Sequence, residues 1–121
     1  MRPKVLIVEE NEQEARSLAS SMTAAAVEIT DESAAIAKLG RGERYDLVLC
    51  DLGGQRAPSV PFSDALRRLS SIEETLLAVI SDDPEESQAF SDAGITVLGP
   101  HAGPDDLRAL LDFASSRVAR T

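Results

Sequence analysis

Short apolar runs alternate with amphipathic stretches along the whole chain. Five runs have the length and character of strands, and they cover residues 5–8, 27–30, 47–50, 76–80 and 95–98. Apolar residues at helical spacing follow each run, as in Ala15, Leu18 and Met22 after the first. Strands that alternate with helices predict a parallel sheet with right-handed crossovers and helices on both faces.

Capping signals mark the beginning of two of the predicted helices. Asn11, with Glu14 three positions later, forms a helix-capping pair. Residues 83–86 combine a capping aspartate, a proline at the first helical position and a glutamate at the third. We expect the helix that follows them to turn Ala89, Phe90 and Ala93 toward the core.

The continuity of each apolar run predicts the place of its strand in the sheet. The four continuous runs predict interior strands, whereas the alternating run at 27–30 predicts an edge strand. A doubly wound sheet with the strand order 2-1-3-4-5 makes strands one and three neighbours at the switch point. Open sheets of this kind bind their ligands in the crevice beyond the carboxyl ends of those strands.

Acidic residues follow the two strands that meet at this point. Glu9 and Glu10 come after the first strand, and Asp51 ends the third. Three carboxylates in one crevice raise their own pKa values or recruit a cation, and a site with oxygen ligands alone favours a hard ion such as Mg²⁺. With a cation bound, Asp51 can act as a nucleophile that forms an acyl phosphate. Ser81, at the end of the fourth strand, can then donate a hydrogen bond to a phosphoryl oxygen.

A simpler interpretation of these acidic residues is that they cap the helices that follow the strands, as is common in α/β domains. For Glu9 or Glu10 alone, this interpretation is the better one. For three carboxylates that share an edge with the hydroxyl of Ser81, we favour a functional site.

Composition narrows the classes of protein that the chain can be. A length of 121 residues suits one domain, and 43% apolar with 27% charged residues indicates a globular chain. No apolar run approaches the roughly 20 residues of a membrane span, and no signal-peptide pattern precedes the first strand, so we expect a cytoplasmic location. A formal net charge of −9 argues against binding of nucleic acid by this chain alone. The single histidine excludes a site with several histidine ligands.

From residue 5 to residue 118 the chain resembles the receiver domains of response regulators in two-component signalling. Val-Leu-Ile-Val-Glu-Glu-Asn (5–11) is similar to the first strand of that family with its acidic pair. Tyr-Asp-Leu-Val-Leu-Cys-Asp-Leu (45–52) is similar to the strand that carries the phosphoacceptor, and Leu-Leu-Ala-Val-Ile-Ser (76–81) to the strand that ends in serine or threonine. The resemblance implies a single receiver domain over residues 1–121, with a flavodoxin-like (βα)5 fold.

The resemblance also implies a role for each residue at the predicted site. Asp51 would be the phosphoacceptor, and Glu9 and Glu10 the acidic pair. These three residues and the backbone carbonyl of Gly53 would bind the cofactor, Mg²⁺. Ser81 would be the hydroxyl that senses the phosphoryl group.

Two positions depart from the family pattern. Gly99 stands where the family has a lysine, and Thr96 stands where it often has a switch aromatic. Loss of a preorganised charge beside a phosphoryl group can cost roughly 3 kcal/mol of transition-state stabilisation. The acidic pair is also unusual, because both of its members are glutamates. We therefore interpret the chain as an atypical receiver.

The function implied is phosphorelay signal transduction in the cytoplasm. The domain would take a phosphoryl group from a histidine kinase onto Asp51 and signal to other proteins by contact, without binding membranes. It would act as a monomer or as a weak homodimer through the face of the fourth helix, fifth strand and fifth helix. No enzymatic activity is expected beyond its own phosphorylation and dephosphorylation. Two alternatives stay open: a degenerate pseudo-receiver that binds proteins independently of phosphorylation and, less well supported, a small magnesium-dependent phosphohydrolase.

Overall fold

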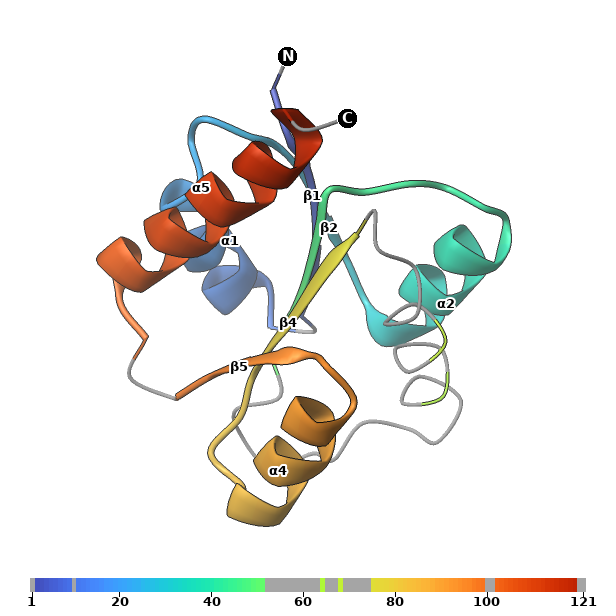
Figure 1. The fold of residues 1–121 in the computed structure, drawn as a ribbon. Helices are drawn as coiled ribbons and strands as arrows, with labels where there is room; N and C mark the ends of the chain where they lie inside the picture. The colour runs from blue at the N-terminus through green and yellow to red at the C-terminus, as the bar shows by residue number, and fades with distance from the viewer. Residues whose placement is uncertain are drawn as a thin grey trace.

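The chain folds into strands and helices in the alternating order that its apolar pattern predicts (Figure 1). The computed structural model describes residues 2–9, 11–51, 64, 68, 75–99 and 102–119, with the backbone alone at 86 and 117–119. The elements are β1 (Lys4–Val8), α1 (Glu12–Ser20), β2 (Ala26–Thr30), α2 (Glu32–Gly40), β3 (Leu47–Asp51), β4 (Leu76–Ile80), α4 (Pro84–Asp92), β5 (Thr96–Leu98) and α5 (Pro104–Ala119). Asp64 and Arg68 are helical, and the rest of the expected third helix lies outside the described residues. None of the described helices is both long and apolar enough to cross a bilayer.

The five strands form one parallel sheet with the order β2-β1-β3-β4-β5, which confirms the predicted flavodoxin-like topology. β1 pairs with β3 from Val5 opposite Leu47 to Val8 opposite Cys50, so the two strands end side by side. Figure 1 shows α1 and α5 together on one face of the sheet and α2 on the other. The residues that follow β1 and β3 are therefore brought to one edge of the sheet, at its switch point.

Side chains of the central strands alternate between two apolar layers. Val5 and Ile7 of β1 pack in the layer under α1 and α5, whereas Leu6 and Val8 pack in the layer under α2 and α4. Because helices cover both faces, β1, β3 and β4 are buried over nearly their whole length, which explains their unbroken apolar runs. Truncation of one such residue to alanine costs about 2–5 kcal/mol. The apolar core therefore contributes more to the stability of the fold than the polar groups at the strand ends.

β5 lies at the second edge of the sheet, so the expectation that its apolar run marks an interior strand was wrong. The strand has only three residues, and all three are exposed or half-buried. Val97 packs against one apolar layer and Leu98 against the other. Cover by helices on both faces, and not a strand on each side, therefore accounts for the apolar character of this run.

α4 begins as its sequence predicts, but fewer of its apolar residues face the core than the sequence predicts. The side chain of Asp83 accepts a hydrogen bond from the backbone N–H of Glu85 at 2.9 Å, and Pro84 is the first helical residue. Phe90 is buried and Ala93 packs partly buried against the same apolar layer, whereas Ala89 is exposed, so the expectation that all three face the core was wrong for Ala89. Adjacent helical positions are separated by about 100° around the axis. The rotation that buries Phe90 therefore carries Ala89 away from the core.

Candidate functional site

Among the described residues, three carboxylates meet at the edge of the sheet where β1 and β3 end. Glu9 follows β1, Asp51 is the last residue of β3, and Glu14 lies in the first turn of α1. One oxygen from each carboxylate lies within 4.8 Å of the other two. Glu9 and Asp51 were expected here from the sequence, and Glu14 was not. We call Glu9, Glu14 and Asp51 the carboxyl-edge cluster; Glu10 and Gly53, also expected at this site, lie outside the described residues.

Asn11 holds two members of the cluster in place. Its side-chain oxygen accepts a hydrogen bond from the backbone N–H of Glu14 at 3.0 Å, as expected of a helix cap. Its own backbone N–H donates to the Glu9 carboxylate, also at 3.0 Å. In a capping box the side chain of Glu14 would accept that second bond, and here Glu9 accepts it instead. The sequence pattern predicts that the Glu14 carboxylate takes part in capping the helix. In the structure this carboxylate does not cap the helix.

Glu9 carries the clearest electrostatic perturbation of the cluster. Partial burial raises its pKa to about 7, helped by a hydrogen bond with Asp51 and opposed by the bond from Asn11. The negative charges of Asp51 and Glu14 raise this pKa further. Oε2 of Glu9 is buried and accepts no hydrogen bond from the described residues. Without a cation, Glu9 can hold a proton that it shares with Asp51, which limits the cost of burying like charges together.

The donor set of the cluster fits a hard divalent cation. All three donors are carboxylate oxygens, which Mg²⁺ and Ca²⁺ prefer. The buried Oε2 of Glu9 is an oxygen that a cation would satisfy. Three oxygens 4.8 Å apart or less enclose a point at most about 2.8 Å from each, against about 2.0–2.1 Å for Mg²⁺ and 2.3–2.6 Å for Ca²⁺. A small inward movement of these side chains is enough to bring all three to an ion.

Ser81 lies at the same edge, one residue beyond β4. Asp51 pairs with Ile80 in the β3–β4 ladder, so Ser81 extends just past the end of β3. Ser81 is buried, its backbone N–H donates to the carbonyl of Leu98 at 3.0 Å, and its hydroxyl accepts from the N–H of Asp83 at 3.3 Å. The sequence therefore predicted correctly that this hydroxyl is at the carboxyl edge.

The two positions that depart from the family pattern lie on or beside β5. Gly99 follows the last residue of β5, one step beyond the pairing of Ile80 with Leu98, and so lies beside Ser81. A Cβ atom added to Gly99 would meet no atom of the described residues within 4 Å. Thr96 is the exposed first residue of β5 and pairs with Ala78.

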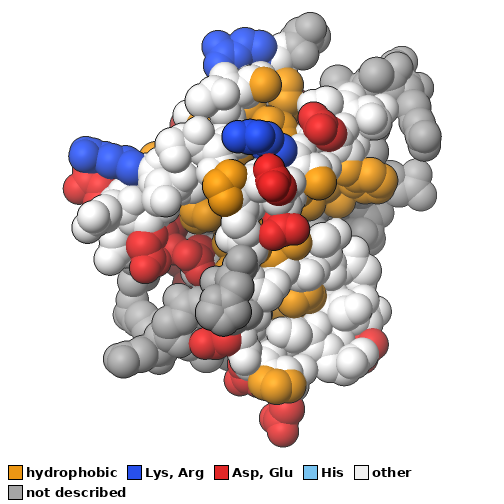
Figure 2. Space-filling view, turned by 90° about the vertical axis from the view of Figure 1, so that its left-hand side faces the viewer, with side chains coloured by type: hydrophobic (Ala, Val, Ile, Leu, Met, Phe, Trp, Pro, Cys, Tyr) orange, Lys and Arg blue, Asp and Glu red, His pale blue; other side chains and the backbone are white. Residues whose placement is uncertain are grey.

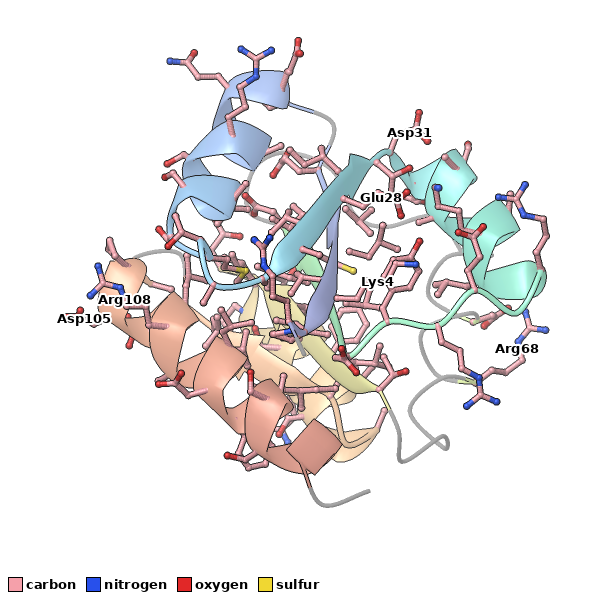
Figure 3. The ribbon with its side chains drawn as sticks, turned by 90° about the horizontal axis from the view of Figure 1, so that it is seen from above. Lys4, Glu28, Asp31, Arg68, Asp105 and Arg108 are labelled. Carbon is pink, nitrogen blue, oxygen red and sulfur yellow. The ribbon has the colours of Figure 1, made fainter. Side chains whose placement is uncertain are left out.

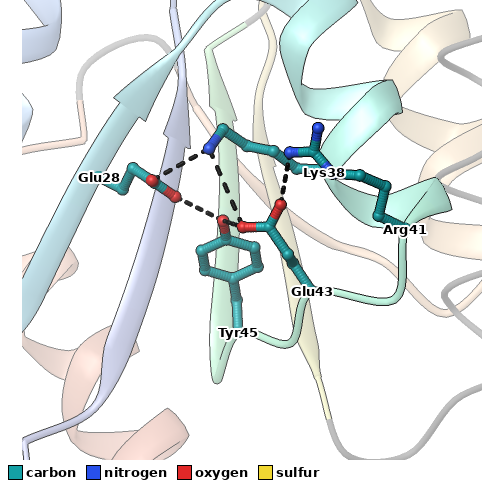
Figure 4. Close-up of polar contacts among 5 residues, drawn as sticks. All are labelled: Glu28, Lys38, Arg41, Glu43 and Tyr45. Carbon is teal, nitrogen blue, oxygen red and sulfur yellow. Dashed lines mark hydrogen bonds and ion pairs between the residues drawn. The ribbon is translucent and has the colours of Figure 1, made fainter.

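A second charged cluster lies at the opposite end of the sheet, between β2, the end of α2 and the segment before β3 (Figure 4). Tyr45 donates to Oε2 of Glu28 at 2.5 Å, and Lys38 lies 3.1 Å from Oε1 of the same residue. Arg41 lies 2.7 Å from Glu43, whose other oxygen is 4.0 Å from Lys38. We call these five residues the amino-edge cluster.

Every acid of the amino-edge cluster has a donor, and the pKa values reflect this. The hydrogen bond from Tyr45, followed by that from Lys38, lowers the pKa of Glu28. The hydrogen bond from Arg41 lowers the pKa of Glu43. Burial, followed by the bond to Glu28, raises the pKa of Tyr45, so the phenol stays protonated and keeps donating. This arrangement satisfies its own charges and leaves no need for a ligand.

No family model and no curated protein matches this chain by sequence. Solved structures of receiver domains do match its fold. The CheY-like response regulator receiver domain protein from Methanospirillum hungatei JF-1 is 16% identical, with a TM-score of 0.78 and full coverage of both chains. Vibrio cholerae CheY4 is 18% identical, with a TM-score of 0.72 over 94% of this chain and 99% of that chain. The BeF3-activated DrrB receiver domain is 16% identical, with a TM-score of 0.76 over 96% of this chain and 99% of that chain.

These likenesses, together with the strand order, define the class: the chain has the fold of a CheY-like response regulator receiver domain. At identities of 16–18% the likeness concerns the fold. The chemistry of this chain has to be argued from its own residues at the carboxyl edge.

Proposed function

We propose that this chain is a receiver domain of phosphorelay signalling that accepts a phosphoryl group from a histidine kinase on Asp51. The observation that carries this proposal is the position of Asp51, which ends β3 within 4.8 Å of the carboxylates of Glu9 and Glu14. That position is the ligand-binding edge of an open α/β sheet. The partners are then a histidine kinase and the protein that receives the signal.

The residues at this edge have distinct roles in the proposed transfer. A divalent cation, when bound, neutralises charge between the carboxylates and an incoming phosphoryl group. A carboxylate oxygen of Asp51 attacks phosphorus, the bond from phosphorus to the histidine nitrogen breaks, and the imidazole leaves with the electron pair of that bond. The product is an acyl phosphate on Asp51. Glu9 and Glu10 would hold the cation together with Asp51, and neither glutamate forms a bond to phosphorus.

Ser81 is the residue that would respond to the new group. Its hydroxyl lies past the end of the strand next to β3 and accepts a bond from the N–H of Asp83. A hydroxyl can accept one hydrogen bond and donate another, so Ser81 can keep the bond from Asp83 while it donates to a phosphoryl oxygen. The start of α4 is then linked to the state of Asp51.

The signalling surface in this proposal is the face of α4, β5 and α5, which binds the next protein or a second copy of the chain weakly. Thr96 is exposed on β5. Threonine is much smaller than an aromatic residue. A movement of its side chain in response to Ser81 therefore changes the surface of this face only slightly. The proposed receiver is therefore a phosphoacceptor with weak transmission to that face.

Incubation with a small phosphodonor, acetyl phosphate, and Mg²⁺ tests the proposal by mass spectrometry of the intact chain. We expect one added phosphoryl group in the wild type, sensitive to hydroxylamine as an acyl phosphate is, and none in Asp51→Asn. Mapping of the label to a residue other than Asp51 contradicts the proposal. Absence of label in both the wild type and Gly99→Lys also contradicts it, and would indicate instead a domain that binds proteins without being phosphorylated.

A further inference from the structure

We propose that Glu14 is a further carboxylate ligand of the cation at the carboxyl edge, in addition to the carboxylates at the strand ends. This inference rests on the proposed function, because it concerns the same site. Glu14 lies on a helix and not after a strand. The consequence is a site that binds a divalent cation more tightly, and accepts an anionic phosphodonor more slowly, than the strand-end carboxylates would alone.

The first argument is geometric. Asn11 fixes Glu9 and Glu14 together, because it binds the carboxylate of one and the backbone N–H of the other, both at 3.0 Å. The first turn of α1 is thereby placed over the end of β1. From that turn, an oxygen of Glu14 lies within 4.8 Å of oxygens of both Glu9 and Asp51. Oε2 of Glu9 is buried and accepts no hydrogen bond from the described residues, so a cation at this site would satisfy an oxygen that has no other partner there.

The second argument is electrostatic. Glu12 lies in the same first turn and pairs with Arg16 at 2.8 Å, as an acid on a solvated helix face commonly does. In the described part of the chain no Lys or Arg pairs with Glu9 or Glu14. Like charges that approach without a counter-charge destabilise one another. A bound cation removes that cost, so its binding gains from each carboxylate that takes part.

The expected effects on cation and phosphodonor are opposite. An additional carboxylate replaces one water on the ion and adds a negative charge, which increases cation affinity. The same negative charge repels the phosphate of an approaching donor. Removal of the Glu14 charge therefore weakens cation binding and, at saturating cation, speeds labelling of Asp51.

Binding of Mn²⁺ to the full chain, followed by the loss of the free-ion electron paramagnetic resonance signal, tests the inference. Glu14→Gln should raise the Kd for Mn²⁺ at least tenfold, and Glu14→Asp, which keeps the charge but shortens the side chain, should raise it by a smaller factor. Glu12→Gln is the matched control, because it removes the same charge from the same turn. Its Kd should stay within twofold of the wild type.

A Kd for Glu14→Gln within twofold of the wild type overturns the inference. Equal Kd values for wild type and Glu14→Asp, with weakening in Glu14→Gln, also overturn it, because they assign Glu14 a long-range charge effect and not ligation. Neither result affects the proposed function if Asp51→Asn still loses Mn²⁺ and phosphoryl label. Retention of Mn²⁺ affinity in Asp51→Asn overturns both. Thermal melts of each variant in a chelator verify that folding is retained.

Discussion

The two ends of the sheet treat the same kind of residue in opposite ways. At the amino edge, Glu28 and Glu43 are bound by cationic or hydroxyl donors, and their pKa values are lowered. At the carboxyl edge, Glu9 lies with two further carboxylates, and its pKa is raised to about 7. The acids of the amino-edge cluster are paired with donors from the same chain. The carboxylates of the carboxyl-edge cluster would instead be stabilised by a bound cation.

The satisfied cluster has a structural role. It ties the edge strand β2 to the end of α2 and the segment before β3 (Figure 4). Figure 3 shows Lys4 and Glu28 on the side of the sheet that faces α2, and the Lys4 ammonium lies 4.7 Å from the centre of the Tyr45 ring. Exposed ion pairs contribute only about 0.2–1 kcal/mol each. The buried ring of Tyr45 therefore contributes more to this attachment than the charges around it.

Acidic groups predominate on the surface of the molecule as well as in the carboxyl-edge cluster. On the side drawn in Figure 2, acidic side chains are spread among uncharged ones with few basic groups between them. The whole chain has a formal net charge of −9. A strongly negative molecule attracts cations from a distance and slows the approach of anions. The cation proposed at the carboxyl edge would therefore bind with the help of the overall field.

The largest expected effect comes from giving the carboxyl edge the kind of cation that Lys38 supplies at the amino edge. For Gly99→Lys, the substituted position lies beside Ser81, and a Cβ atom at this position meets no atom of the described residues within 4 Å. A positive charge next to a phosphoryl group in transfer can contribute roughly 3 kcal/mol, so labelling of Asp51 by acetyl phosphate should accelerate up to about 100-fold. Gly99→Gln, similar in length but neutral, is the control. Equal rates in both variants would show that the charge at position 99 is not what limits labelling.

Removal of one hydroxyl should weaken the amino-edge cluster and leave the carboxyl edge unchanged. Tyr45→Phe keeps the buried ring but removes the donor to Glu28. Urea unfolding should show a loss of about 1.5–3 kcal/mol, the usual contribution of a hydrogen bond to a charged group. Affinity for Mn²⁺ should not change. A change in that affinity would contradict the independence of the two ends.

The two clusters should respond to pH in opposite directions. Glu9 keeps its proton in the folded chain up to about pH 7 but loses it near 4.5 in the unfolded chain. Its protonated form therefore stabilises the fold fully below pH 4.5, and this contribution is lost as the pH rises through 7. We expect a loss on the order of 1–2 kcal/mol across that window in a chelator, reduced by solvent because the carboxyl is partly exposed.

Urea unfolding at a series of pH values measures this effect, with Glu9→Gln as the variant that should abolish it. Glu28 has a lowered pKa, so its contribution is present above pH 4.5 and is lost as the pH falls through its folded value. Glu28→Gln should therefore alter only the acidic limb of the profile. A fall between pH 4.5 and 7 that persists in Glu9→Gln would show that another group causes it.

The smallest expected effect is on partner binding at the face of α4, β5 and α5. Phosphorylation changes affinity only through contacts that differ between the two states. With Thr96 at the start of β5, a beryllofluoride phosphoryl mimic should change partner affinity less than tenfold, which is below about 1.4 kcal/mol. Thr96→Tyr should increase that difference. A tenfold or larger change in the wild type would show that threonine transmits the signal.

The sequence predicted which strands are buried on both faces and which residues lie at the ends of those strands. β1, β3 and β4 are buried on both sides, so their apolar runs were unmistakable, and the acids that follow β1 and β3 had to share an edge. Glu14 was missed because its pattern with Asn11 has a sufficient local explanation as a helix cap. Only the rotation of the first helical turn brings its carboxylate to Glu9.

The amino-edge cluster was not visible in the sequence for a different reason. Glu28 and Tyr45 are 17 positions apart and belong to a strand and a loop, so no periodicity joins them. The predicted strand order placed β5 correctly at an edge, but its apolar run was interpreted as that of an interior strand, because cover by helices gives an edge strand the composition of an interior one. Contacts that depend on how elements pack across the sheet leave no local pattern.

The central claim is that the carboxyl-edge cluster binds a divalent cation and the amino-edge cluster does not. Thermal unfolding with and without millimolar Mg²⁺ tests it directly, because an ion that binds the folded chain alone stabilises it. We predict a higher Tm with Mg²⁺ in the wild type and in Glu28→Gln, and a much smaller shift in Asp51→Ala. No shift in the wild type, or an equal shift in Asp51→Ala, would contradict the claim.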